Sequence, residues 1–297
     1  MFIAHSKDNG KTQPLKEHLE NVADLARKFA YAFDNGTAEV AYQMGLAHDL
    51  GKYSDKFQAR IRGDYLGSVD HSTAGGQVLA SLGNTVGAYG VMGHHSGLMN
   101  GGSKRFDIGK EQSGTFYSRL KKPVENYKAY EKEISLENNV KDLKIKPITG
   151  VGFSTAFLIR MLYSTLVDAD FLDTEAFMAD APINRGHHDS MDELYLRYKE
   201  YVQRFSCPKT SIHQKRNEIL SDCLQKAEEE RGLYSLTVPT GGGKTISSLG
   251  FALKHAKLHG LDRVIYLIPY TSIIEQTAQV IGEILGHENV LEHHSSV

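Results

Sequence analysis

The sequence is poor in cysteine and has no tryptophan and no long apolar run. Its 297 residues include two cysteines, Cys207 and Cys223, which excludes a scaffold built on disulfides and is typical of a cytosolic protein. No apolar stretch approaches the roughly 20 residues that span a bilayer. The first residues also lack the charged-then-apolar order of a signal peptide. We therefore expect a cytoplasmic protein with no membrane partner.

The sequence also lacks an excess of charge of either sign. Its 34 lysines and arginines nearly balance 36 aspartates and glutamates, which leaves a net charge of −2. Binding to a polyanion through overall charge is therefore excluded, and contact with phosphate would need a local basic patch or a bound metal. What the sequence does have is histidine, with 14 residues. The placement of these histidines is informative.

Hydrophobic periodicity divides the chain into two parts. Up to about residue 205 it predicts helices over 15–33, 38–51, 54–62, 72–82, 86–95, 123–138, 151–172 and 190–204. The pattern then changes: β-rich runs at 233–238 and 264–268 flank a helical stretch at 245–259, which predicts a βαβ unit in a parallel sheet. We therefore expect a helical domain over 1–205, a helical linker over 206–232 and an α/β segment over 233–297.

Several histidines and aspartates lie at predicted element ends or on inward helix faces. His18 is in register with Leu15 and Val22, and Asp168 is placed on the apolar stripe of the helix at 151–172. A lone histidine usually ligates nothing, but a set of this kind indicates a metal site, since imidazole is a common neutral ligand and a carboxylate can bridge two ions. The candidate ligands are His18, His48, Asp49, His71, His94, His95 and Asp168.

These residues carry a resemblance to a known family. The motifs are His5-Ser6, Leu15-Lys16-Glu17-His18, His48-Asp49-Leu50-Gly51-Lys52, Asp70-His71-Ser72, His94-His95 and Leu166-Val167-Asp168-Ala169-Asp170. Together they resemble the nuclease domain of the CRISPR type I nuclease-helicases, in which an HD-superfamily phosphohydrolase is fused to a superfamily 2 helicase. The resemblance implies a mainly α HD-domain bundle followed by an incomplete α/β RecA-like P-loop segment.

The resemblance also implies a two-metal site. The first ion would be held by His18, His48, Asp49 and Asp168, and the second by Asp49, His71, His94 and His95. Imidazole-rich ligation favours Mn, Fe, Co, Ni or Zn over Mg²⁺. Asp49 and Lys52 are the expected catalytic residues, and Lys52 would either contact the scissile phosphate or orient a ligand. For His5 and Asp170, a structural role weighs at least as much as ligation.

A glycine-rich run follows the first predicted strand and opens a helix, as a phosphate-binding loop does. It comprises Thr240, Gly241, Gly242, Gly243, Lys244 and Thr245, and it resembles motif I of superfamily 2 helicases. Lys244 would reach the ATP phosphates and Thr245 would hold Mg²⁺. Neither a following Asp-Glu motif nor a second RecA-like lobe is present. We expect part of a longer protein or a truncated product, which neither hydrolyses ATP efficiently nor unwinds DNA.

A basic segment at 97–122 contains Lys104, Arg105, Lys110, Arg119, Lys121 and Lys122 against only two acidic residues. Interleaved aromatic residues suit single-stranded DNA, although a merely solvated insert is an equal alternative. The favoured function is a metal-dependent nuclease that cuts single-stranded DNA, joined to the start of a helicase motor. The resemblance implies antiviral defence and recruitment by a CRISPR type I surveillance complex. Two alternatives are an HD phosphohydrolase acting on small nucleotides and a non-catalytic adaptor that binds nucleic acid or ATP.

Overall fold

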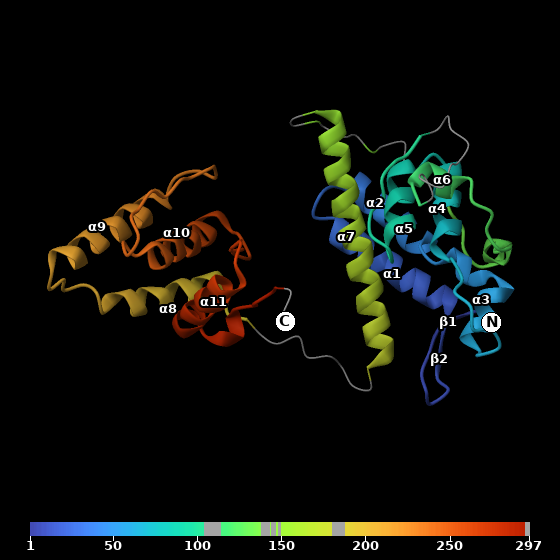
Figure 1. The fold of residues 1–297 in the computed structure, drawn as a ribbon, viewed down its shortest axis with the longest axis horizontal. Helices are drawn as coiled ribbons and strands as arrows, with labels where there is room; N and C mark the ends of the chain where they lie inside the picture. Colours follow the sequence, from blue (N-terminus) through green and yellow to red (C-terminus); the bar gives the residue numbers. More distant parts are fainter. Residues whose placement is uncertain (104–113, 138–142, 144–146, 148–149, 180–187, 295–297) are drawn as a thin grey trace. The chain divides into compact units, whose positions relative to one another are not determined.

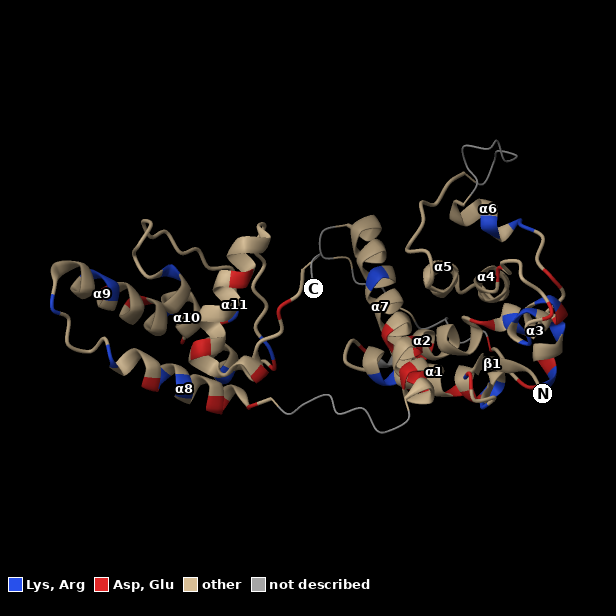
Figure 2. Ribbon diagram, turned by 60° about the horizontal axis from the view of Figure 1, so that its bottom comes forward, with Lys and Arg blue, Asp and Glu red and all other residues tan. Residues whose placement is uncertain are grey.

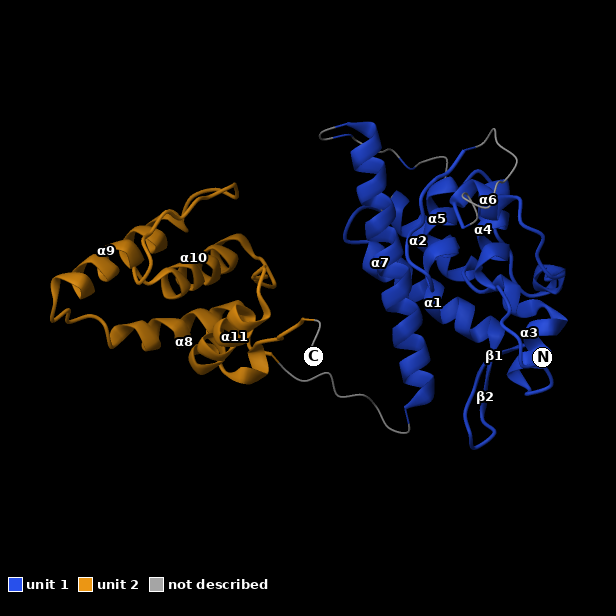
Figure 3. Cartoon of the chain, viewed as in Figure 1, with its two compact units in different colours: residues 1–183 blue, residues 184–297 orange. Residues whose placement is uncertain are grey.

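The computed structural model describes every residue except 104–113, 138–142, 144–146, 148–149, 180–187 and 295–297. The chain divides into two units, Met1–Ile183 and Asn184–Val297 (Figure 3). In the first unit the elements are β1 (Ile3–Ser6), β2 (Thr12–Pro14), α1 (Leu15–Ala30), α2 (Asn35–Ala47), η1 (Leu50–Tyr53), α3 (Asp55–Ile61), α4 (Ser72–Ser81), α5 (Thr85–Gly93), α6 (Phe116–Leu120), η3 (Lys128–Lys132) and α7 (Val151–Met178) (Figure 1). In the second they are α8 (Met191–Gln203), α9 (Ser211–Lys226), α10 (Lys244–His259), α11 (Thr271–Leu285) and η5 (His287–Asn289). No described helix is both long enough and apolar enough to cross a bilayer.

The first unit is a helical bundle built around α1. The apolar face of α1 buries Leu15, Leu19 and Val22 completely, and it packs against α2 and α7. Helix α5 packs against α4 and α7 and so extends the same core. Burial of a one-sided apolar stripe is the main source of stability for helices of this length. The expected helical bundle is therefore confirmed.

Two glycines let helices approach α2 at backbone distance. A β-carbon on Gly45 would meet the backbone of Ala23 in α1, and one on Gly75 in α4 would meet the carbonyl oxygen of Ala47. Only glycine, which has no side chain, allows such close contacts without displacing a helix. The end of α2 is therefore held between α1 and α4, and the residues that follow it enter the middle of the bundle.

The start of the chain forms a hairpin that periodicity did not predict. Strands β1 and β2 are antiparallel, with Ser6 opposite Thr12. Strands of four and three residues are too short to show a clear alternation of polar and apolar side chains. The side-chain amide of Gln58 accepts from the N–H of Ile3 and donates to its carbonyl, which fixes β1 against α3. The helix expected at 123–138 is reduced, in the described residues, to the short η3.

Helix α8 belongs to the second unit, so the boundary expected near residue 205 lies earlier, between Ile183 and Asn184. The apolar face of α8 is buried against α10 and α11, through Leu194 and Tyr198. The Tyr198 hydroxyl donates to the carbonyl of Ile246 at 2.9 Å. The helix break after residue 205 was a correct helix end, but the end of a helix need not be the end of a domain.

The two strands expected in the second unit do not form. Residues 233–238 and 264–268 have no ladder partner, and the only sheet among the described residues pairs β1 with β2. Ile265 is 75% exposed and Leu267 is 91% exposed. β-Branched residues favour a strand, but a strand also needs a hydrogen-bonded neighbour. The expected order, a mainly α bundle followed by a partial helicase segment, nevertheless holds for the chain as a whole.

Candidate metal centre

Asp49 lies at the break between α2 and η1. His48 is the C-cap of α2, and Asp49 leaves helical geometry with φ −115° and ψ 21°. Both side chains are buried, with His48 fully enclosed and Asp49 1% exposed. An unpaired buried carboxylate is costly, so its surroundings must supply positive charge or hydrogen-bond donors. The residues around Asp49 therefore indicate what this position is built to do.

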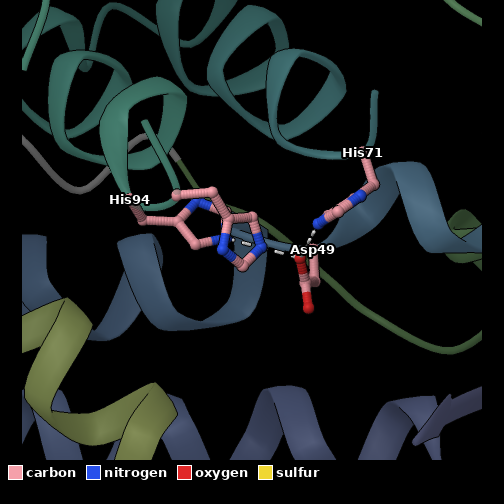
Figure 4. Close-up of side chains that lie close together, drawn as sticks. Asp49, His71 and His94 are labelled. Carbon is pink, nitrogen blue, oxygen red and sulfur yellow. Dashed lines mark ion pairs between the residues drawn. The ribbon is translucent and has the colours of Figure 1, made fainter. Parts of the chain in front are cut away.

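The two carboxylate oxygens of Asp49 face different pairs of histidines. Oδ1 is 3.5 Å from Nε2 of His71 and 3.5 Å from Nε2 of His94, and Figure 4 shows both rings directed at Asp49. Oδ2 is 3.6 Å from Nε2 of His18 and 3.4 Å from Nε2 of His48. One carboxylate therefore lies between two sets of imidazole nitrogens, which is the arrangement expected of a ligand that bridges two cations.

The opposite nitrogen of each of these imidazoles is held by an oxygen atom. An oxygen at Nδ1 favours the tautomer in which Nδ1 carries the proton and Nε2 keeps its lone pair for a metal. The Nδ1–oxygen contacts are His18–Asp173 at 2.6 Å, His48–Gly45 carbonyl at 2.7 Å, His94–Val91 carbonyl at 2.7 Å and His71–Val69 carbonyl at 3.1 Å.

Gly51 brings His71 to Asp49. The Gly51 N–H donates to the carbonyl of His71 at 3.1 Å, and a β-carbon on Gly51 would meet the His71 backbone. His71 precedes α4, so it comes from a segment that is separate in sequence from α2 and η1. The absence of a side chain at position 51 therefore allows the two segments to meet at the carboxylate.

The donor atoms fit a transition-metal cation. Oδ1 of Asp49, Nε2 of His71 and Nε2 of His94 are buried and have no hydrogen-bond partner in the described part of the chain. Buried polar atoms are normally paired, so three converging exceptions call for an explanation. Imidazole nitrogen with carboxylate oxygen is a donor set that Mn, Fe, Co, Ni and Zn accept readily. The residues present thus fit the expected metals.

Asp170, and not Asp168, lies at the cluster. Asp170 Oδ1 is 3.4 Å from Nε2 of His18 and 3.7 Å from Nε2 of His48, whereas Asp168 is exposed. Two residues along a helix are about 200° apart around its axis, so the two side chains leave opposite sides of α7. The placement of Asp168 on the inward face was wrong. Asp170 and Asp173, three residues apart, share the inward face, and that spacing was the available signal.

The donor atoms form two overlapping groups. Those of Asp49, His71, His94 and His95 lie within 4.8 Å of one another, and so do those of His18, His48 and Asp49. Two further groups link these sets, namely His48, His94 and Asp170, and His5, His18 and Asp170. His95 is exposed, so the group that contains it opens toward solvent. Apart from Asp168, the structure brings all the candidate ligands together.

Lys52 places a positive charge beside the carboxylate of Asp49. Its Nζ is 2.7 Å from Oδ2 of Asp49, and it also donates to the carbonyl of Ala4 at 3.3 Å. Burial would raise the pKa of Asp49, but Lys52, His48 and His71 outweigh burial and hold that pKa well below its usual value. Asp49 is therefore ionised. Of the two roles expected for Lys52, the position of its ammonium group favours orientation of a ligand.

The innermost histidines have raised pKa values. Burial opposes protonation of His18, but hydrogen bonds with Asp170, Asp173 and Asp49 raise its pKa to about 9. Burial also opposes protonation of His48, but Asp49 and Asp170 raise its pKa to about 10. Burial lowers the pKa of the more peripheral His5 and His95 to about 4 in each case. A proton on His18 or His48 occupies the position that a cation would take.

The basic segment is only partly described, because Lys104, Arg105 and Lys110 lie outside the described residues. The Arg119 guanidinium is engaged within the fold: it donates to Thr73 Oγ1, Ser72 Oγ and the carbonyl of Met92 and lies 3.4 Å from Asp70. Lys122 pairs with Asp70 at 2.6 Å, while Lys121 is exposed. The structure therefore gives Arg119 a structural role that the sequence analysis did not anticipate.

The glycine-rich run has the backbone of a tight loop before a helix. Gly241 and Gly243 have φ of 83° and 86°, a region that favours glycine, and α10 starts at Lys244. The N–H of Gly242 donates to the carbonyl of Pro239, and the Arg216 side chain donates to the carbonyl of Gly241. The helix N-terminus that follows presents free N–H groups, which is the geometry that binds phosphate. This arrangement fits the predicted loop from Thr240 to Thr245.

Comparison with known families agrees with this geometry. A family model for the HD domain matches residues 15–143, which include His18, His48, Asp49, His71 and both residues of the His94-His95 pair. The first unit is an HD domain. A second family model, type III restriction enzyme, res subunit (ResIII), matches residues 209–295 and so covers the glycine-rich loop. A comparison with curated protein sequences finds no match.

Two solved structures share the fold of this chain. A crystal structure of T. fusca Cas3-ATP matches with 17% identity and a TM-score of 0.52, covering 100% of this chain and 38% of that one. A crystal structure of T. fusca Cas3-AMPPNP matches with 17% identity and a TM-score of 0.51, covering 99% of this chain and 38% of that one. This chain therefore spans less than two fifths of the length of the Cas3 chains, and it has an HD domain followed by a ResIII-type helicase segment.

Proposed function

We propose that the HD domain is a metal-dependent nuclease that cleaves single-stranded DNA. The observation that carries the proposal is Asp49, whose two oxygens face His71 and His94 on one side and His18 and His48 on the other. A fully buried structural polar cluster would pair its members with one another. Here Nε2 of His71 and Nε2 of His94 have no hydrogen-bond partner among the described residues and converge on one carboxylate oxygen, and the group that contains them opens to solvent at His95.

The first ion would be held by His18, His48, Asp49 and Asp170, and the second by Asp49, His71, His94 and His95. When bound, a pair of divalent ions supplies positive charge to the phosphodiester and lowers the pKa of the attacking water. Imidazole-rich ligation favours transition metals for both positions, and Asp49 would be the shared ligand.

The protein's own residues provide the orientation. Asp173 fixes His18 through Nδ1, and the carbonyls of Gly45 and Val91 fix His48 and His94 in the same way. Lys52 holds Oδ2 of Asp49 and so sets the rotation of the bridging carboxylate. Such supporting contacts usually alter metal affinity by 10- to 100-fold when they are removed.

Circular single-stranded DNA tests the proposal. After treatment with chelator and reloading with Mn, Fe, Co, Ni or Zn in turn, the chain should linearise the circle, and Asp49→Ala should abolish cleavage without unfolding the protein. The exposed Asp168→Ala serves as the matched control and should cleave normally. Hydrolysis of dNTPs or cyclic nucleotides without any DNA cleavage would support the small-nucleotide phosphohydrolase instead. Tight metal binding with neither activity would support a non-catalytic adaptor.

We further propose that the second unit binds ATP and Mg²⁺ through Thr240, Gly241, Gly242, Gly243, Lys244 and Thr245. In this proposal it is part of a motor that feeds DNA to the HD domain in CRISPR antiviral defence, after recruitment by a type I surveillance complex. The positive φ angles of Gly241 and Gly243 before α10 support the phosphate site. Lys244→Ala should weaken ATP binding, as measured by calorimetry, and should leave cleavage of naked single-stranded DNA unchanged.

A further inference from the structure

A cavity of about 860 Å³ lies directly beside the group of candidate ligands that opens to solvent, namely Asp49, His71, His94 and His95. His71 and His95 form part of its wall. The rest of the wall comes from the segment before α4, the segment after α5, and α6 with the residues that follow it. A volume of this size is typical of a site for a small ligand. The cavity is therefore continuous with the part of the metal centre that opens to solvent.

The cavity is lined by both apolar and positively charged side chains. Val69, Leu98, Met99 and Pro123 contribute apolar surface. Arg119, Lys121 and Lys122 contribute three positive charges against the single carboxylate of Asp70. Figure 2 shows basic residues at the C-terminal end of α6, where this wall lies. An apolar recess with a cationic rim suits a ligand that has a flat apolar part and an anionic backbone.

The basic residues of the wall differ in how strongly contacts within the fold already hold them. Arg119 is held by Thr73, Ser72 and the carbonyl of Met92, so it contributes charge to the wall but has few donors left for a ligand. Among the described residues no ion pair holds Lys121, and its side chain is exposed. Lys121 is therefore the group in this wall that is best placed to meet a phosphate.

We propose that this cavity binds one unstacked nucleotide of the DNA strand, next to the phosphate held at the metal centre. The base occupies the apolar recess, and Lys121 pairs with the phosphate of the bound nucleotide. The inference rests on the proposed nuclease function and adds a reason for its strand preference. A base in a duplex is stacked and paired, so it can enter a pocket only after leaving the duplex, whereas a base in a single strand pays little for this.

An abasic scan tests the cavity. A short fluorescein-labelled oligothymidylate is made with one abasic residue at each position in turn, and its cleavage by the metal-loaded chain is measured. Removal of the base that fills the cavity should slow cleavage by roughly 10- to 150-fold at one position beside the cut, which is the size of effect expected when one large apolar group is no longer buried. Equal cleavage of all these oligonucleotides would overturn the cavity proposal and leave the nuclease function intact.

Two matched pairs of variants locate the effect. Ser118→Trp fills the cavity from α6, while Ser81→Trp is its control, because both serines donate to the carbonyl three residues earlier and Ser81 lies outside this cavity. Lys121→Ala removes the free cation of the wall, and Lys128→Ala removes an exposed lysine that does not line it. Anisotropy of the labelled oligonucleotide in EDTA should show weaker binding for the first member of each pair only.

The outcomes separate the two ideas. If Ser118→Trp binds and cleaves the intact oligonucleotide like Ser81→Trp, the cavity does not hold a base and the inference is wrong. If Ser118→Trp cleaves the intact strand more slowly than Ser81→Trp, and an abasic residue at the sensitive position slows its cleavage no further, the base and the indole compete for the same space, as proposed. If the wild-type chain cleaves none of the DNA substrates with any metal, the proposed function fails and the inference fails with it.

Discussion

Nδ1 of His18 lies 2.6 Å from Oδ2 of Asp173, across the interface between α1 and α7. The carboxylate of Asp173 also accepts from the side-chain amides of Gln13 and Asn21, at 2.7 and 2.8 Å. Its position is therefore fixed by three donors from one side of the bundle. A carboxylate behind an imidazole orients the ring and strengthens its opposite nitrogen as a ligand. Asp173 thus orients a candidate metal ligand, His18, from behind, without itself belonging to the groups of donor atoms.

Asp173→Asn should lower metal affinity by roughly 10- to 100-fold, because the His18 ring loses the charged partner that orients it. Metal affinity is measured by competition with a chromogenic chelator, and circular dichroism checks that the helices are retained. Asp168→Asn is the matched control on the same helix, since Asp168 is exposed and should leave affinity unchanged. Equal affinities for the two variants would show that the His18–Asp173 contact is merely structural.

Asp170→Asn should abolish occupancy of the metal position that involves His18 and His48, because Asp170 is the second carboxylate within reach of both rings. Elemental analysis should find one equivalent of metal fewer than in the wild-type chain, and cleavage of circular single-stranded DNA should fall at least a hundredfold (about 10²) if both ions are needed. Full metal content in Asp170→Asn, with loss in Asp168→Asn, would restore the ligand set expected from the sequence.

Metal binding should release protons and should strengthen as pH rises. In the metal-free protein the pKa of His18 is about 9 and that of His48 about 10, both above the ordinary 6.5, and a cation must displace those protons. A raised pKa stabilises the fold below 6.5, and that stabilisation is lost as pH increases through 9 to 10. The increase in Tm on adding metal should therefore become larger as pH rises from 6.5 to 10. A constant gain from pH 6.5 to 10 would contradict these pKa values.

Arg119→Ala should lower the free energy of unfolding of the HD domain by about 1–3 kcal/mol, because it leaves partners at the start of α4 and at the end of α5 without their donor. Urea titration followed by circular dichroism measures the change. Lys121→Ala, two residues along, should alter stability by no more than about 0.5 kcal/mol, since its side chain is exposed. Equal stability of the two variants would return Arg119 to the role of a free DNA contact.

Sequence reasoning brought most of the candidate ligands together because their motifs lie at the ends of clear helices. His48 and Asp49 are adjacent at the end of one helix, and His94-His95 ends another. It failed at Asp168 because α7 is apolar around much of its circumference, with Phe153 and Phe171 exposed, so the stripe did not single out one face. The burial of Leu162, Leu166 and Asp173 depends on the helices that pack against α7, and periodicity alone cannot supply it.

In the second unit, strand propensity predicted two strands that do not form. The run around Ile265 has strong β propensity, yet a strand exists only with a neighbour, and no described segment pairs with it. The glycine-rich loop was easier to predict, because the positive φ of Gly243 and the helix start at Lys244 are local properties of the sequence. Local geometry could therefore be predicted, whereas pairing between distant segments could not.

In the proposed two-metal site, the single carboxylate of Asp49 couples the two cation positions. Each cation would be ligated by an oxygen of the same carboxylate, so filling one position would change the affinity of the other, and linkage requires that effect to be reciprocal. The affinity measured for one ion would then depend on whether the other is already bound, so a titration with a single metal should not follow the curve of two independent sites.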